Sequence, residues 1–303
     1  MSEKFRLKCF NLVLGLGRKG YLNFVPDRMY LKTQYWLKLG RGLNLKKPAL
    51  YNEKLQWIKL YDRNPLYTRM ADKLAVRDYV AERGCGQYLI PMLAACDRSD
   101  QIDWDALPER FVVKCTHGSS SNIIVTDKAK LDRADAMRKL ERWRKRNWFW
   151  LSREWPYKNV RPRILIEAFI GDENGKAPYD YKLLCFDGEP AYVIVDADRY
   201  DGHTRNYYSP DWVKQDIFNR HPNIPRDIPR PDHLDEMLEV ARKLSRGIPH
   251  VRVDLYEANG RVYFGETTFF HGYGMEVFRP REFEMHLGDL IPLPPQNKTG
   301  APK

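Results

Sequence analysis

The amino-acid sequence predicts an α+β protein in which a mostly helical N-terminal region precedes a part rich in β-strands. Up to about residue 90, glycine and proline residues separate stretches with helical patterning. From residue 111 onwards, short runs of apolar and β-branched residues alternate with turn residues, which is typical of strands. The chain has 303 residues, 43% of them hydrophobic, enough for a sizeable core and for two domains of ~150 residues. We expect a helical region at residues 1–106, a second domain at residues 107–290 and a loose tail at residues 291–303.

The first twenty residues predict an amphipathic helix. Residues 10–16 are apolar, and the basic residues that flank them are Lys4, Arg6, Lys8, Arg18 and Lys19. This apolar run is shorter than the ~18 residues that span a membrane, and it lacks the small-residue cleavage site of a signal peptide. A helix of this kind could lie on a membrane, so the inner face of the membrane is one partner to consider.

Turn residues separate the elements that we expect further along the chain. Pro26 and Pro48 each precede a helical stretch, and Gly40 ends the first of these. Asp187-Gly188 and Asn259-Gly260 are typical turns of β-hairpins. The expected helices cover residues 27–40, 52–61, 72–82, 128–150 and 232–244. The expected strands cover residues 88–93, 111–114, 123–125, 163–170, 179–186, 191–195, 250–256 and 261–268.

The composition favours an anionic partner and a reducing compartment. The formal net charge of +11 favours nucleotides or acidic polysaccharides, although many basic proteins carry such charge only for solubility. The five cysteines are scattered and form no CxxC pair, which argues against a disulfide framework or a zinc site. We therefore expect a cytoplasmic protein with reduced thiols. Nucleic acid is not an expected partner, because the aromatic residues of the basic stretch 128–150 fit the buried face of a helix.

The last hairpin carries charged residues at spacings that place them on shared faces. Arg252 and Asp254 lie two apart on one strand, and Glu266 and Thr268 lie two apart on the other. Two carboxylates could hold Mg²⁺ together with phosphate oxygens, and an arginine beside them could bind a phosphoryl group. A two-residue turn at Asn259-Gly260 would put Asp254 and Glu266 on opposite faces, so a shared metal requires an odd-length loop or a bulge. The alternative is a solvent-exposed strand face with ordinary charges.

Two lysines, a loop and a strand end are candidates for binding a nucleotide. Lys114 ends an apolar strand, and Lys182 lies on a later strand, where it could face phosphates or solvent. The loop, which a phosphate could approach closely, consists of Gly118, Ser119, Ser120 and Ser121. The strand end, whose backbone could face an adenine, consists of Glu167, Ala168, Phe169 and Ile170, and Asp172 after it could bind ribose hydroxyls. Alone, the loop is equally typical of a flexible hairpin, and its strand–loop–strand order differs from that of a P-loop.

Taken together, these stretches resemble the TupA-like family of the ATP-grasp superfamily. The resemblance extends from about residue 27 to about residue 278. It rests on stretches in the same order, namely residues 51–67, 71–77 (ADKLAVR), 107–118, 152–157 (SREWPY), 180–182 (DYK), 251–256 (VRVDLY) and 265–269 (GETTF). It implies an ATP-grasp fold, in which two α+β subdomains grip ATP, with ATP and Mg²⁺ as cofactors.

The resemblance implies roles for the candidate residues. Lys114 and Lys182 would contact the ATP phosphates under the 118–121 loop, and residues 167–170 would form the adenine hinge. Asp254 and Glu266 would hold Mg²⁺, and Arg252 would stabilise an acyl phosphate.

The resemblance also implies roles for residues after the metal strand, where this chain departs from the family. Gly272 and Gly274 would shape the loop near the reacting carboxyl group. Thr268 stands where the family often has asparagine, and its neutral hydroxyl would bind a second Mg²⁺ more weakly. His271 stands where a proline is expected, and it could act as an acid or a base near the amine.

The activity that the resemblance implies is ATP-dependent ligation of a carboxylate to an amine through an acyl phosphate. The acid would be a uronic acid of a cell-surface polysaccharide such as a capsule, and the amine would be an amino acid. One alternative is an ATP-grasp kinase that phosphorylates a small molecule. Another is a glycosyltransferase that holds the metal of a sugar nucleotide with the DxD triplet Asp196-Ala-Asp198, although this triplet is common by chance.

Overall fold

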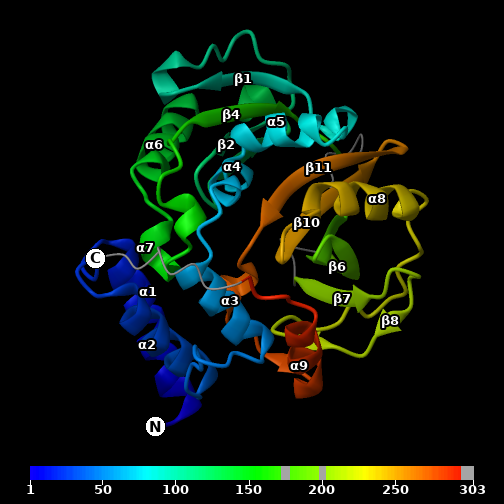
Figure 1. The fold of residues 1–303 in the computed structure, drawn as a ribbon. Coiled ribbons are helices and arrows are strands. Elements are labelled where there is room, and N and C mark those ends of the chain that lie inside the picture. The colour runs from blue at the N-terminus through cyan, green and yellow to red at the C-terminus, as the bar shows by residue number, and fades with distance from the viewer. Residues whose placement is uncertain (172–177, 198–202, 295–303) are drawn as a thin grey trace.

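The structure, a computed structural model, describes residues 1–171, 178–197 and 203–294. Helices of the N-terminal part pack beside two separate antiparallel β-sheets (Figure 1). The predicted α+β class is therefore confirmed. Within these described ranges, every helix is too short or too polar to cross a bilayer.

Helices α1 to α5 form the N-terminal part. Gly40 ends α2 with a left-handed φ of 73°, as expected from its position in the sequence. The expected helix at residues 72–82 starts later, because Asp72 ends α4 and its carboxylate accepts the N–H of Leu74 at 2.9 Å. The sequence did not predict α4. The bounds are α1 Glu3–Arg18, α2 Asp27–Leu39, α3 Tyr51–Tyr61, α4 Leu66–Ala71 and α5 Ala75–Glu82.

The smaller sheet has the strand order β1-β4-β2-β3, and helix α6 packs against it (Figure 1). The strand expected at residues 88–93 starts later, at Met92, because a 3₁₀ turn covers Gly86–Tyr88 and Pro91, which has no N–H, precedes the strand. The expected helix at 128–150 is divided, since the Asp132 carboxylate caps a helix that ends at Arg144. The bounds are β1 Met92–Cys96, β2 Phe111–Cys115, β3 Asn122–Val125, β4 Ile164–Ala168, α6 Arg133–Arg144 and α7 Phe149–Ser152.

The larger sheet has the strand order β11-β10-β5-β6-β7-β8, with helix α8 on one face (Figure 1). The sequence did not predict β7, β8, the small β9–β12 ladder or helix α9, which packs on α3. The strand bounds are β5 Asp180–Phe186, β6 Glu189–Ala197, β7 Thr204–Tyr208, β8 Lys214–Gln215, β9 Phe218–Asn219, β10 His250–Ala258, β11 Arg261–Thr268 and β12 Phe278–Arg279. The helix bounds are α8 Leu234–Ser245 and α9 Arg281–Asp289.

The N-terminal helices share their hydrophobic core with the larger sheet. Leu55 and Ile58 of α3 belong to the same buried cluster as Val251 and Val253 of β10. The smaller sheet has a separate core, which contains Phe111 and also Leu140 of α6. Burial of this apolar surface stabilises the arrangement, at roughly 25 cal/mol per Å² removed from water.

Candidate functional site

A β-bulge brings the two candidate metal carboxylates opposite each other. The turn pairs Ala258 with Arg261, the register of a two-residue loop. The register then shifts, so that Leu255 faces Phe264 and Asp254 faces Glu266, with Gly265 as the extra residue. Directly opposite residues of an antiparallel pair have their side chains on the same face. The bulge that a shared metal site requires is therefore present.

Arg252 is tied to the carboxylate of Asp254. Its Nε lies 2.6 Å from Oδ1 and its Nη2 lies 2.6 Å from Oδ2, while Nη2 also donates to the Thr268 hydroxyl at 3.1 Å. Burial raises the pKa of Asp254 to about 6, although the charges of Arg252 and Lys182 oppose that shift. Burial also favours a raised pKa at Glu266. There the positive charges of Lys73 and Arg252 have the larger effect and lower the pKa to about 2.

Lys73 is a site residue that sequence reasoning did not identify. Its Nζ lies 2.5 Å from Oε2 of Glu266, and its backbone N–H donates to the Thr116 carbonyl at 3.1 Å. Lys73 thus joins the end of β2 to β11, and the Lys114 charge also contributes to the low pKa of Glu266. The signal was the stretch 71–77, which carries the family resemblance although no role was given to it.

Lys114 and the strand end at Glu167 are brought together. Lys114 Nζ lies 2.7 Å from one carboxylate oxygen of Glu167, and Arg77 Nη1 lies 3.0 Å from the other. The Glu167 side chain is therefore neutralised on both sides, and it is buried. Of the expected hinge, Ala168, Phe169 and Ile170 are half-buried, and Asp172 lies outside the described residues.

Lys182 lies in a buried network of charges rather than facing solvent. It forms ion pairs with Asp180 and, at 3.1 Å, with Asp196. Asp196 also accepts two hydrogen bonds from Arg205, at 2.6 and 2.9 Å, and lies 3.2 Å from His203. Asp198 lies outside the described residues. Because cationic side chains surround Asp196, the DxD interpretation gains no support.

His271 lies at the end of this network. Its Nε2 lies 3.5 Å from Arg205 Nη1, and its side chain is buried. Burial and the nearby guanidinium groups of Arg252 and Arg205 hold the pKa of His271 well below its usual range. The imidazole is therefore neutral near pH 7, with one ring N–H and one acceptor nitrogen.

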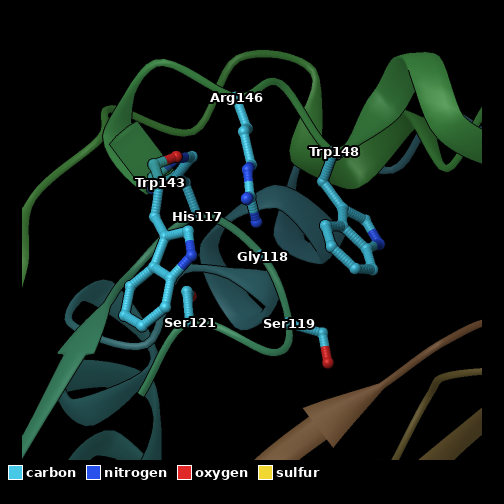
Figure 2. A pocket seen from close by; sticks show the side chains of 7 residues that line it. All are labelled: His117, Gly118, Ser119, Ser121, Trp143, Arg146 and Trp148. Atoms are coloured by element: carbon cyan, nitrogen blue, oxygen red, sulfur yellow. The ribbon is translucent and has the colours of Figure 1, made fainter. Parts of the chain in front are cut away.

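The small-residue loop lines a pocket (Figure 2). His117, Gly118, Ser119 and Ser121 form one side, and the other side consists of Trp143, Arg146 and Trp148. A Cβ added to Gly118 would lie 3.2 Å from the Trp148 indole, so the backbone of the loop packs closely on that ring. Ser119 and Ser120 are exposed. The loop is thus anchored at Gly118 and open at its tip.

The donor set at the bulge is consistent with magnesium held jointly with phosphates. Among the described residues, no group of three or more histidine, cysteine or carboxylate side chains is close enough to hold a metal. Asp254 and Glu266 provide two carboxylates, and Thr268 follows on the same strand. Mg²⁺ is commonly bound through one or two carboxylates plus substrate phosphates rather than by a complete protein cage.

Comparisons with known proteins agree with the family resemblance. A family model described as TupA-like ATPgrasp matches residues 53–292. No curated protein matches the chain. Similar solved structures have low identity and TM-scores below 0.5. They include the D-alanine–D-alanine ligase of Helicobacter pylori, with 15% identity, 82% of this chain and 68% of that chain covered, and a TM-score of 0.45. The D-alanine–D-alanine ligase of Bacillus anthracis complexed with ATP has 15% identity, 73% and 58% coverage, and a TM-score of 0.39.

A third similar structure is the ATP-grasp ligase PsnB complexed with a phosphomimetic variant of its minimal precursor, Mg and ADP. It has 12% identity to this chain, 90% and 70% coverage, and a TM-score of 0.42. The chain spans 58% of the length of the Bacillus anthracis ligase, which is less than two thirds.

Proposed function

Because the chain belongs to the TupA-like ATP-grasp family, we propose that it is an enzyme that uses ATP to join a carboxylate to an amine. The observation that carries this proposal is the bulge at Gly265, which sets Asp254 opposite Glu266. Arg252, Lys73 and Lys182 lie around these carboxylates, and together they form a site suited to a triphosphate.

The proposed nucleotide site lies between the two sheets. Lys114 and Lys182 bind the phosphates, and the loop 118–121 covers them with backbone N–H groups. The backbone of Glu167, Ala168, Phe169 and Ile170 faces the adenine, and Asp172 binds the ribose. Lys73, tied to Glu266, is a further phosphate contact.

Magnesium, when bound, would be held by Asp254, Glu266 and Thr268, and it would neutralise charge on the phosphates. On ATP binding, the ammonium of Lys73 exchanges part of its contact with Glu266 for phosphate oxygens. Arg252 remains anchored by Asp254, so its guanidinium is already oriented when negative charge develops on the transferring phosphoryl group.

The reaction has two steps. A carboxylate oxygen of the acid attacks the γ-phosphorus, the bond to the β–γ bridging oxygen breaks, and ADP leaves with the bonding electrons. The nitrogen of the amine then attacks the acyl carbon, the carbon–oxygen bond to phosphate breaks, and the nitrogen loses a proton. The proposed role of His271 is that of an acid or a base near the amine, and burial and the nearby guanidinium groups make its neutral imidazole a weak base. Unchanged turnover across pH in His271→Asn would remove this role.

The proposed acid is a uronic acid of a cell-surface polysaccharide such as a capsule, and the proposed amine is an amino acid. The net charge of +11 suits an anionic glycan or its precursor. The site as described has cations around the reacting centre, which also suits an acidic substrate.

The proposed location is the cytoplasm, at the inner face of the membrane. Seven large apolar side chains of the first 36 residues are exposed, from 45% at Trp36 to 83% at Phe24, and the same segment is rich in lysine and arginine. Exposed apolar groups beside basic ones fit an anionic bilayer surface. Cosedimentation with anionic but not with neutral vesicles, reduced in Phe24→Asp and unchanged in Met285→Asp, would support this; equal sedimentation of both variants would refute it.

The activity is tested by measuring ADP and phosphate with Mg²⁺ across a panel of uronic acids and amino acids, wild type beside Asp254→Asn. Phosphate that is released only with both acid and amine, and lost in the variant, supports the ligase. A γ-phosphate that stays in a product indicates the kinase alternative. Absence of ATP binding rules out both, and sugar-nucleotide binding in its place would favour the glycosyltransferase.

A further inference from the structure

The loop that follows β11 has an unusual backbone. Gly272, Tyr273 and Gly274 all have left-handed conformations, with φ values of 55°, 63° and 61°. Tyr273 is not a glycine, so its conformation is disfavoured unless neighbouring groups hold it. A backbone of this shape needs a support, and helix α3 of the N-terminal part supplies one.

Helix α3 presents a row of buried polar side chains to this loop. Asn52, Gln56 and Lys59 lie four and three residues apart, so they share one face of the helix, and each is at most 1% exposed. Gln56 Nε2 donates to the carbonyls of Tyr273 at 3.2 Å and Gly274 at 2.7 Å. Lys59 Nζ also donates to the Tyr273 carbonyl, at 2.7 Å. Two side chains of α3 therefore bind two consecutive carbonyls of the left-handed turn.

The other end of the loop is fixed by Asn52. Its Nδ2 donates to the Glu276 carbonyl at 2.7 Å, and its Oδ1 accepts the Glu276 N–H at 2.9 Å. This pairing satisfies both backbone groups of one loop residue, as a β-ladder would.

The surroundings of Gly272 and Gly274 leave little room for a side chain. A Cβ added to Gly274 would lie 2.7 Å from Gln56 Nε2 and 3.0 Å from Leu55 Cβ, and one added to Gly272 would meet the Glu276 carboxylate at 1.6 Å. Both glycines have a left-handed φ, in which a side chain is strained, and a Cβ at Gly274 would also displace Gln56 or Leu55.

Lys59 connects the loop to a third segment. It also donates to the Ser152 carbonyl at 3.0 Å, and the Ser152 hydroxyl donates to Glu154 at 2.6 Å. Burial lowers the pKa of Lys59 to about 8, while the charge of Glu154 opposes that shift. Through its two carbonyl acceptors, Lys59 ties the loop to the segment around Ser152.

The loop is directly joined to the candidate site. It begins three residues after Thr268, and His271 at its start contacts Arg205. The loop therefore links the carbonyls held by α3 to His271, which lies near Arg205 and Arg252.

We propose that Gln56 and Lys59 are positioning residues for the ligation: α3 holds the loop 271–274 in the shape that receives the acid substrate. This inference rests on the proposed function. It gives the helical N-terminal region a part in the reaction, because α3 holds the loop that orients the reacting carboxylate. A displacement of about 1 Å in such a support can reduce the rate about a hundredfold.

The test compares Gln56→Leu and Lys59→Met with Lys54→Met, a matched control on the same helix whose Nζ donates to the Ile291 carbonyl outside the loop. We expect kcat for amide formation to fall at least tenfold and KM for the acid to rise in the first two variants. The dissociation constant for ATP should stay within twofold in all three. Because Lys59→Met removes the positive charge that opposes the burial of Glu154, Lys59→Met/Glu154→Gln replaces it if the single variant does not fold.

Hydrogen exchange provides a readout that does not depend on activity. Amides of residues 270–276 should exchange faster in Gln56→Leu than in wild type, with no change in the smaller sheet. Unchanged kcat and unchanged exchange in an active enzyme would overturn the positioning role alone. A wild type without acid-dependent ADP release would overturn the proposed function, and the inference with it.

Discussion

His250 makes the stability of the protein depend on pH in a way that can be calculated. It is the first residue of β10, two before Arg252, and it is buried. One ring nitrogen lies 2.9 Å from the Tyr51 hydroxyl and the other 2.9 Å from the Cys185 carbonyl. Burial, helped by the charge of Arg252 and opposed by the hydrogen bond to Cys185, lowers the pKa of His250 to about 3.

The unfolded chain binds a proton at His250 that the folded protein does not. With an unfolded pKa of about 6.5, the folded state loses stability as the pH falls from about 6.5 towards 3, and nothing is lost above that range. At pH 5, protonation of His250 stabilises the unfolded state by RT ln(1 + 10^1.5), which is about 2 kcal/mol. The folded state is stabilised by almost nothing, because its pKa lies about two units below this pH. The free energy of unfolding should therefore fall by about 2 kcal/mol between pH 8 and pH 5 through this residue alone.

The assay is urea unfolding of wild type, His250→Asn and His286→Asn at pH 8 and pH 5. The other buried histidines contribute equally to the pH-dependent loss of stability in all three proteins. The difference in this loss between wild type and a variant therefore reports the replaced histidine. We expect the loss between the two pH values to be about 2 kcal/mol smaller in His250→Asn than in wild type. His286 is exposed, and its variant should lose as much as wild type. An equal loss in His250→Asn and wild type would refute this explanation.

Three further predictions concern single contacts, each measured as the free energy of unfolding in urea. Gly17→Ala should cost about 1–3 kcal/mol, because the added Cβ would lie 2.2 Å from the Tyr30 hydroxyl and 2.7 Å from the Trp150 carbonyl. Glu53→Ala should cost about 1 kcal/mol, because the carboxylate accepts the N–H groups at the start of α3, at 3.0 and 3.2 Å. Asp196→Asn should cost about 3–5 kcal/mol, because it leaves Lys182 and Arg205 buried with one partner fewer. For any of the three, a value within about 0.5 kcal/mol of wild type would contradict the importance of that contact.

The sequence could predict those parts of the site whose cause is local. Arg252 and Asp254 lie two apart on one strand, and Glu266 and Thr268 lie two apart on the other. With a two-residue turn at Asn259-Gly260, the carboxylates of Asp254 and Glu266 can share a face only if the hairpin contains a bulge. Spacing alone left open whether that bulge exists. The structure shows it at Gly265, where a Cβ would lie 2.7 Å from the Tyr256 ring.

Contacts between distant segments were beyond sequence reasoning. Lys73 reaches Glu266 across 193 positions of the chain, and no local pattern indicates such a pair. Helix α3 was expected from its apolar positions, but nothing in its periodicity indicated that Gln56 and Lys59 would be buried against a loop more than 210 residues later. The first residues of β7 are polar, so its sequence has only a weak preference for a strand. It forms one because it pairs with β6 and β8.

An acyl phosphate intermediate is tested most directly by following oxygen from the acid. Ligation would be run with ATP, Mg²⁺, the amine and an acid whose carboxylate carries ¹⁸O on both positions. We predict that each released phosphate carries one ¹⁸O atom, since the carboxylate oxygen that attacks the γ-phosphorus leaves with phosphate, and that Asp254→Asn releases no labelled phosphate. Amide formed together with unlabelled phosphate would contradict the acyl phosphate and the proposed ligase mechanism.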